Sequence, residues 1–152
     1  MHKQTSSPSV IRYFVLLLAV LLFISNIFPM NALAAEARAS YYLSSYQAYI
    51  YPAGSGEVQV WFDVTGVNYM DDIGVLWIEI YESTDNSAWT YKKTYMHTDY
   101  SSLLGQDDIF HSGHISYQGV KGRYYKAYVC IWAGKDGGGD TRYYWTSSKK
   151  AT

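Results

Sequence analysis

The amino-acid sequence predicts an all-β domain, an antiparallel sandwich of two sheets with about seven strands, preceded by a helical signal peptide. From residue 40 onward, apolar and polar residues alternate with a period of two, which is typical of half-buried strands. No window in this part of the chain has the apolar spacing of an amphipathic helix. Clusters of turn residues interrupt the alternation at short intervals, so the segments between them are expected to be short antiparallel strands.

The first two expected strands flank the turn Pro52 to Gly56, and the second has the clearest alternation in the chain. Its residues Val58, Val60, Phe62 and Val64 share one face. Later strands are bounded by a polar turn after Glu82, a polar loop before Ile109 and glycine-containing corners, and Lys149 to Thr152 is expected to be a frayed tail. The expected strands are Leu43 to Tyr51, Glu57 to Thr65, Gly74 to Glu82, Trp89 to Met96, Ile109 to Tyr117, Arg123 to Ala133 and Thr141 to Ser147.

The expected strand from Arg123 to Ala133 follows a corner, Gly119-Val120-Lys121-Gly122. This arrangement resembles the sixth strand of immunoglobulin-like and fibronectin type III-like sandwiches, in which a tyrosine near the start of the strand bonds back to the preceding corner. The resemblance implies this role for Tyr125. The sequence departs from that pattern because no cysteine pair joins the sheets, and the usual core tryptophan would be Trp61 or Trp77.

Residues 1–34 have the three parts of a secretory signal peptide. Basic residues precede an uncharged apolar run from Tyr13 to Ile24, and Ala32-Leu33-Ala34 forms a small-residue cleavage motif. We expect cleavage after Ala34, with Ala35 and Ala39 as alternative sites, and a secreted, extracellular domain over residues 35–152. The alternative is an uncleaved membrane anchor, for which the apolar run is short, because a spanning helix needs about 20 apolar residues.

Two further stretches support a resemblance that covers most of the segment after the expected cleavage site. They are the run from Ile78 to Ser83, which continues to Trp89, and the run from Gly122 to Val129. Together with the signal peptide, they resemble small, tyrosine-rich secreted proteins of Gram-positive bacteria that form an uncharacterised domain family. The resemblance implies export from a bacterium and brings no activity with it.

The composition narrows the classes of function. Lys and Arg total 12 against 13 Asp and Glu, which does not favour nucleic acid as a partner. A hydrophobic content of 49% is too high for a disordered chain, and a single cysteine excludes an intramolecular disulfide and a cysteine-based zinc cluster. Aromatic residues make up 18% of the chain, with 17 tyrosines and 5 tryptophans, and so become the main candidates for function.

Alternation divides the aromatic residues between the two faces of their strands. If Leu76, Ile78, Ile80, Tyr125, Val129 and Ile131 point inward, a set of aromatic neighbours on two adjacent strands points outward. These candidate ligand-binding residues are Trp77, Tyr81, Tyr124, Tyr128 and Trp132. The last strand would add Tyr143 and Trp145, or else Tyr144, depending on register. Such a platform suits sugar rings or a protein partner, and the alternative is that the rings only stabilise the sheet.

The sequence gives little support for a metal, a cofactor or catalysis. Acidic pairs at Asp71-Asp72 and Asp107-Asp108, and Asp136 with Asp140, are either calcium ligands or solvated turn residues. His111 and His114 would point to opposite faces of a strand, and we expect Cys130 to be a passive thiol. The motifs of serine hydrolases, metalloproteases and nucleotide-binding proteins are absent from the sequence. We therefore expect no enzyme, no metal site and no cofactor.

The sequence thus favours a secreted, non-catalytic binding module whose ligand is a glycan or a protein at the cell surface. Two alternatives remain. One is a self-associating structural protein of the cell envelope, and the other is a small secreted hydrolase without a recognisable motif. No nucleic acid is expected, and contact with a membrane is expected only through an uncleaved signal peptide. The sequence leaves the oligomeric state open.

Overall fold

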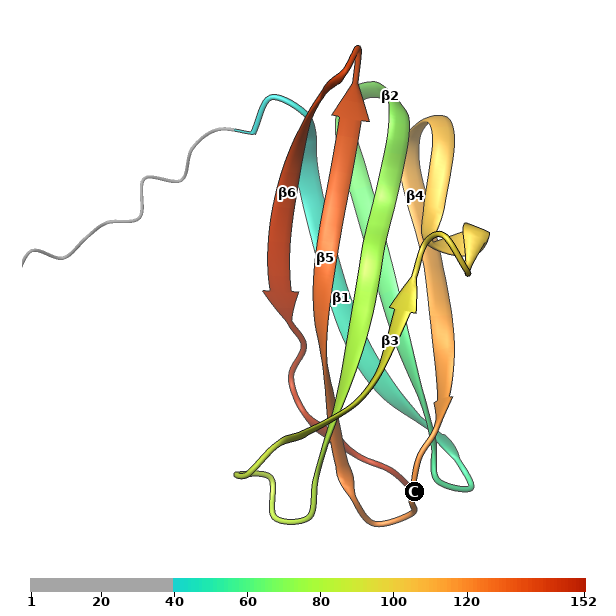
Figure 1. The fold of residues 1–152 in the computed structure, drawn as a ribbon, viewed down its shortest axis with the longest axis vertical. Helices are drawn as coiled ribbons and strands as arrows, with labels where there is room; N and C mark the ends of the chain where they lie inside the picture. The colour runs from blue at the N-terminus through green and yellow to red at the C-terminus, as the bar shows by residue number, and fades with distance from the viewer. Residues whose placement is uncertain (1–39) are drawn as a thin grey trace, which may run out of the picture. The chain divides into compact units, whose positions relative to one another are not determined.

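A computed structural model describes residues 40–152, so the predicted signal peptide lies outside the described residues. This part of the chain is all-β and its strand pairs are antiparallel, as predicted (Figure 1). A short 3-10 turn, η1 (Ser101–Leu103), is its one helical element, and residues 40–152 contain no helix long and apolar enough to cross a membrane. The strands are β1 (Leu43–Gly54), β2 (Glu57–Ser83), β3 (Thr90–Met96), β4 (Leu104–Gln118), β5 (Tyr124–Lys135), β6 (Gly138–Trp145) and β7 (Lys149–Lys150).

Strand β2 organises the sheet because it runs for 27 residues without interruption. Its first part pairs with β1 and β4, and its second part pairs with β3 and β5. The sequence predicted two strands here, and the gap between them is instead continuous strand. Gly66 lies in close packing against Met70, whose Cγ would be 2.8 Å from an added Cβ, and does not open a turn. The hydrogen bonds therefore form one curled seven-stranded sheet, whereas two separate sheets were expected.

The core lies on the concave side of the curled sheet. The alternation predicted from the sequence is confirmed in β2, where Val58, Val60, Phe62 and Val64 are fully buried. The inward positions predicted for Ile78, Ile80, Tyr125, Val129 and Ile131 are also confirmed. Leu76 is only half-buried, because a register shift between Val75 and Trp77 interrupts the alternation at that point.

Contacts across the core hold the two halves of the sheet against each other. Tyr117 on β4 packs on Tyr125 of β5 with ring centroids 5.8 Å apart. The Tyr95 hydroxyl on β3 donates a 2.8 Å hydrogen bond to the backbone oxygen of Ser116 on β4. Through this hydrogen bond, the Tyr95 side chain joins β3 to β4, two strands that do not pair with each other.

The strand count agrees with the prediction, although the strands themselves differ. Two predicted strands merge into β2, and the expected frayed tail instead forms β7, which pairs with the start of β5. Ala151 is buried in the core, and its backbone N–H donates to Arg123. The segment predicted as a loop before Ile109 contains η1 and the first residues of β4. Gly113 lies in a regular ladder without a bulge, opposite Phe62, whose ring leaves no room for a Cβ.

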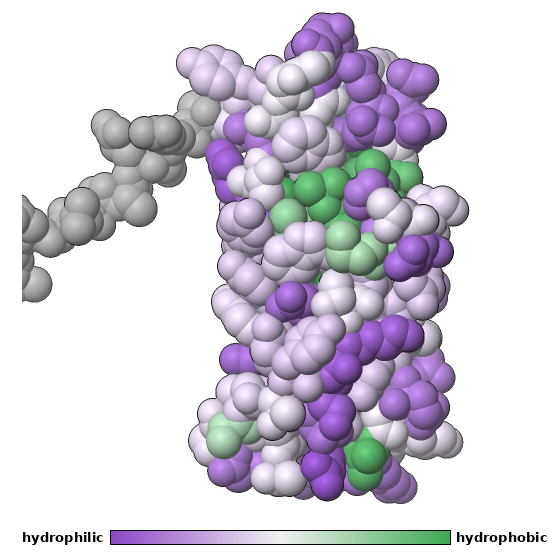
Figure 2. Space-filling model, viewed as in Figure 1, coloured by the Kyte–Doolittle hydropathy of each residue, from purple (hydrophilic) through white to green (hydrophobic). Residues whose placement is uncertain are grey.

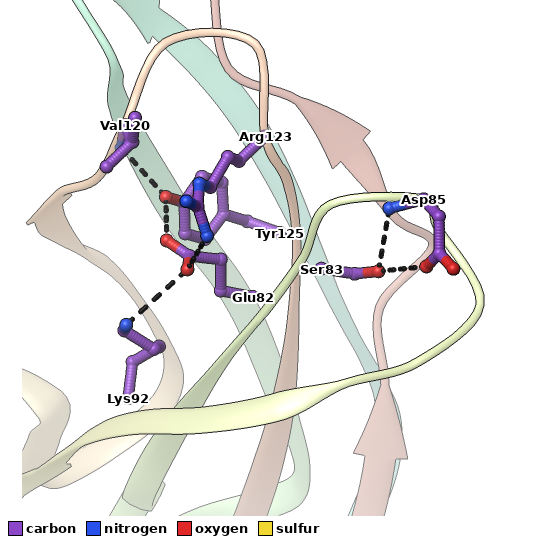
Figure 3. A network of polar contacts seen from close by, with 7 residues as sticks. All are labelled: Glu82, Ser83, Asp85, Lys92, Val120, Arg123 and Tyr125. Carbon is purple, nitrogen blue, oxygen red and sulfur yellow. Dashed lines mark hydrogen bonds and ion pairs between the residues drawn. The ribbon is translucent and has the colours of Figure 1, made fainter.

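The hydrogen bond that the resemblance implied for Tyr125 is present. The Val120 N–H donates to the Tyr125 hydroxyl at 2.8 Å, and that hydroxyl donates to Oε2 of Glu82 at 2.5 Å (Figure 3). Arg123 and Lys92 hold the other carboxylate oxygen of Glu82 at 2.9 and 3.4 Å. Glu82 is buried, so the Tyr125 hydroxyl and the charges of Arg123 and Lys92 stabilise a carboxylate that burial alone would destabilise. This network ties the start of β5 to the end of β2 and the start of β3.

Candidate ligand-binding face

The outward surface of β3, the second part of β2, β5 and β6 carries most of the candidate residues. Pairing places Tyr128 of β5 between Glu79 of β2 and Trp145 of β6. In the next outward-facing row, Cys130 lies between Trp77 and Tyr143. Side chains that are opposite one another in a ladder share a face, so these rows form one continuous surface. We call this surface the aromatic face.

Six rings on the aromatic face form a connected cluster, in which neighbouring centroids are 4.5 to 6.0 Å apart. The closest pair is Tyr128 and Trp145, which are nearly parallel at an interplanar angle of 19°. The members of this aromatic cluster are Trp77, Tyr81, Tyr91, Tyr128, Tyr143 and Trp145. Distances of this size are typical of rings in favourable contact, so the cluster is a packed unit.

The cluster is open to solvent on its outer side. Tyr143 is 61% exposed, Tyr91 is 51% exposed and Trp145 is 46% exposed, while the rings between them are half-buried. Figure 2 shows this side of the molecule, on which β2, β3, β5 and β6 lie toward the viewer. Much of the surface there has intermediate hydropathy, with a hydrophobic patch in the upper half and strongly hydrophilic residues at the top and in a band across the lower half. The face is therefore both aromatic and accessible.

Three of the five predicted binding residues, Trp77, Tyr81 and Tyr128, belong to the aromatic cluster. The other two lie half-buried on the same four strands, outside the ring contacts of the cluster. Tyr124 pairs with Lys150, whose Nζ lies over its ring, and Trp132 lies against the glycines of the β5–β6 hairpin. The structure thus brings three predicted residues together and leaves two beside them.

The register in which the strands pair decides which other residues belong to the cluster. The sequence left open whether the last strand contributes Tyr143 and Trp145 or Tyr144, and the pairing of Trp145 with Tyr128 decides for the first pair. Tyr144 instead packs against the core. Tyr91 was not among the predicted residues, since no feature of the sequence shows that it pairs with Tyr81.

Polar groups accompany the rings. The Tyr81 hydroxyl donates a 2.7 Å hydrogen bond to the Glu79 carboxylate. This hydrogen bond and burial together raise the pKa of Tyr81 to about 12, so its hydroxyl stays protonated at physiological pH. Lys126 lies over the ring of Trp145 with its Nζ 4.3 Å from the centroid. The face therefore offers ring surfaces, hydroxyl groups, one carboxylate and an ammonium group within one cluster.

The opposite surface, over β1, β2 and β4, carries a smaller aromatic row. Trp61 pairs with Tyr49 on one side and with His114 on the other, and its ring stacks on His114 at 4.3 Å. Trp61 and Trp77 are both half-buried on outward surfaces, so neither is a core tryptophan of the kind found in immunoglobulin domains. Trp61 provides a comparison residue for experiments on the aromatic face.

The acidic turns and the histidines do not converge. Within residues 40–152, no three His, Cys, Asp or Glu side chains lie together as a metal site would require. Asp71 accepts a hydrogen bond from the backbone N–H of Asp136, and Asp140 accepts one from the Ser40 hydroxyl. His111 packs on Phe62 of the core and His114 stacks on Trp61 outside, so the prediction of opposite faces is confirmed.

The fold and the aromatic face together define the class of this protein, which is an all-β domain with an aromatic surface open to solvent. No protein-family model and no curated protein sequence matches the chain. It is similar to part of the crystal structure of a family 76 glycoside hydrolase from a bovine Bacteroides thetaiotaomicron strain, with a TM-score of 0.32 and 17% identity, over 70% of this chain and 20% of that chain. It is also similar to a protein from Archaeoglobus fulgidus, with a TM-score of 0.34 and 8% identity, over 72% of this chain and 98% of that chain.

The chain thus spans about a fifth of the hydrolase. At these TM-scores the two similarities carry no conclusion about activity.

Proposed function

We propose that this protein is a non-catalytic binding module that holds a carbohydrate on its aromatic face. The observation that carries the proposal is the aromatic cluster, in which six rings on four adjacent strands stay in contact while three of them remain widely exposed. Exposed aromatic patches of this kind serve recognition, because each ring buries a large apolar area at a low cost in conformational entropy. The apolar C–H faces of sugar rings are a suitable complement to such surfaces.

The polar groups of the face support a hydroxyl-rich ligand. Tyrosine hydroxyls donate and accept hydrogen bonds, and the Glu79 carboxylate is an acceptor held in place by Tyr81. Orientation by a few polar groups within an aromatic surface is the usual design of a small-ligand site. The partner of Glu79 is a tyrosine hydroxyl, whereas hydrolysis of a glycoside calls for two carboxyl groups about 5 to 10 Å apart. The arrangement thus favours binding over catalysis.

The test is retention on a panel of insoluble polysaccharides, with the bound fraction measured over a range of protein concentrations. Trp145→Ala and Tyr128→Ala each remove a ring of the closest pair, and each is expected to weaken retention about tenfold or more. Trp61→Ala is the matched control, because it removes a half-buried tryptophan from the opposite surface. Retention that is equal in all three variants, each shown to be folded by circular dichroism, would overturn the proposal.

Self-association is a second candidate function, favoured by strand β6. Within residues 40–152, β6 pairs with β5 on one side only, and its outward residues Tyr143 and Trp145 are exposed. An edge of this kind can pair with a second copy of the chain. Light scattering over a concentration series separates the two functions, since a binding module without self-association keeps a constant mass.

We infer that the fold is a variant of the immunoglobulin-like sandwich in which the long β2 joins what would otherwise be two sheets. The hydrogen bond between Val120 and Tyr125 supports this relation. We also keep export to the cell exterior as part of the proposed function, on the sequence of residues 1–34 alone.

A further inference from the structure

Lys126 belongs to the aromatic face and Lys150 borders it on β7, and both contact ring surfaces. Lys126 of β5 has its Nζ 4.3 Å from the Trp145 ring centroid and 4.5 Å from that of Trp89. Lys150 of β7 has its Nζ 5.3 Å from the Tyr124 centroid. An ammonium group over an aromatic ring is stabilised by the ring quadrupole and keeps N–H donors for another partner. The rings therefore position these cations without neutralising them.

Neither lysine has a carboxylate partner in the part of the chain that the structure describes. Within residues 40–152, no Asp or Glu oxygen lies within 4.0 Å of either Nζ. The neighbouring cations Lys92 and Arg123 are different, because both are paired with Glu82. Glu79, the carboxylate one row away from Lys126, accepts a hydrogen bond from Tyr81. Lys126 and Lys150 are thus the cations of this face that remain available to a ligand.

Charge is also separated along the molecule. The end that contains β7 and the start of β5 carries Lys149 and Lys150 near Lys126, while Arg123 at this end is paired with Glu82. The opposite end contains the β5–β6 hairpin (Figure 1), where the Asp136 N–H donates to the Asp71 carboxylate, and the strand pairing places most of the aspartates there. These aspartates are Asp71, Asp72, Asp107, Asp108, Asp136 and Asp140. The positively charged end of the folded molecule is therefore the end of the aromatic face at which Lys126 and Lys150 lie.

We propose that the ligand of the aromatic face is an anionic polysaccharide, which stacks its sugar rings on the aromatic cluster and places acidic groups against Lys126 and Lys150. This inference rests on the proposed carbohydrate-binding function and names the class of ligand. A single-stranded nucleic acid would also present anions and flat rings. It is the less suitable occupant, because its evenly spaced phosphates call for a groove of cations along the whole site. The far end of this molecule is acidic instead.

The experiment measures affinity for three soluble probes by calorimetry at low and high salt. Polygalacturonate is the anionic probe, its fully methyl-esterified form is the neutral probe with the same backbone, and a single-stranded oligonucleotide is the third. We expect polygalacturonate to bind at least tenfold more tightly than the ester at low salt. The difference should disappear near 1 M salt, where the Debye length is about 3 Å.

Variants assign the effect to the two lysines. Lys126→Gln and Lys150→Gln are each expected to reduce the preference for polygalacturonate while binding of the ester persists. Lys126→Arg should retain the preference for polygalacturonate, because it keeps the charge and the contact with the rings. Lys135→Gln is the matched control, since Lys135 lies on the same strand at the other end and bonds to the Tyr69 carbonyl. Lys150 contacts Tyr124 rather than the cluster, so its variant tests the charge if Lys126→Gln disturbs Trp145.

The outcomes separate the two proposals. Equal binding of the anionic and neutral polymers, unchanged in both lysine variants, would overturn the inference and leave the carbohydrate-binding function standing. Binding of neither polymer, together with no retention on insoluble polysaccharides, would overturn both. Tighter binding of the oligonucleotide than of polygalacturonate would overturn the assignment to a polysaccharide.

Discussion

Trp77 and Tyr143 belong to strands that β5 separates, and their ring centroids are nevertheless 6.0 Å apart. Two strand spacings in a sheet amount to about 9 to 10 Å. The residue between them is Cys130, which pairs with both. Its side chain is small enough for the two rings to approach each other across β5, and Cys130 is buried although its strand position faces outward. This small residue permits the direct contact between Trp77 and Tyr143, whose rings also both contact Tyr128.

The first prediction concerns the reactivity of the Cys130 thiol. Burial raises its pKa to about 11, and we expect the folded protein to react with Ellman's reagent at pH 8 far more slowly than the denatured protein. Tyr143→Ala or Trp77→Ala should increase the native rate by removing a neighbouring ring. Trp61→Ala, on the opposite surface, should leave it unchanged. A thiol that reacts equally fast in the native and denatured protein would contradict the packing described above.

The second prediction concerns the Tyr125 hydroxyl, which bonds to Val120 and to Glu82. Tyr125→Phe keeps the buried ring and removes both hydrogen bonds, leaving the buried carboxylate with one donor fewer. We expect the free energy of unfolding to fall by about 1 to 3 kcal/mol, measured by urea denaturation. Tyr124→Phe is the control, because the Tyr124 hydroxyl has no hydrogen-bond partner in residues 40–152 and should cost little. Equal losses in the two variants would refute the importance of this network.

The third prediction concerns acid stability and Glu82. Burial alone would raise the pKa of this carboxyl, but the Tyr125 hydrogen bond and the charges of Lys92 and Arg123 outweigh burial and hold the pKa below its usual value. A carboxyl with a lowered folded pKa adds stability above its unfolded pKa of about 4.3, and this stability is lost as the pH falls through the folded pKa.

We therefore expect Glu82→Gln to lose less stability than the parent protein between pH 7 and pH 3, as measured by urea denaturation at each pH. The pKa values of Asp85 and Asp140 are also lowered, and these groups are present in both proteins. Their effect cancels in the comparison. An identical loss in parent and variant would show that Glu82 does not contribute to the acid transition.

The fourth prediction concerns Gly134, where an added Cβ would lie 2.7 Å from Cζ2 of Trp132. Gly134→Ala must displace the tryptophan ring, and we expect a loss of about 1 to 3 kcal/mol in the free energy of unfolding with a change in tryptophan fluorescence. The same substitution in a Trp132→Phe background should cost less, because the smaller ring leaves room for the methyl group. A cost that is the same in both backgrounds would exclude the ring as the cause.

The sequence by itself determined which face of β2 and of β5 is buried. Val58, Phe62 and Tyr125 could be assigned to the core because successive side chains of a strand point to opposite sides, and this geometry is local. It also determined that Trp77, Tyr81 and Tyr128 face outward. The implied hydrogen bond from the Tyr125 corner is local in the same sense, since Val120 is five residues away.

Only the tertiary structure decided which outward residues are neighbours. The pairing of Tyr128 with Trp145, rather than with Tyr144, and of Tyr81 with Tyr91 follows from backbone hydrogen bonds between segments that are apart in the sequence. A shift of one residue would have moved every side chain of β6 to the other face, and no single strand specifies that register. The unbroken course of β2 has the same origin, because the hydrogen bonds that continue it come from β4 and β5.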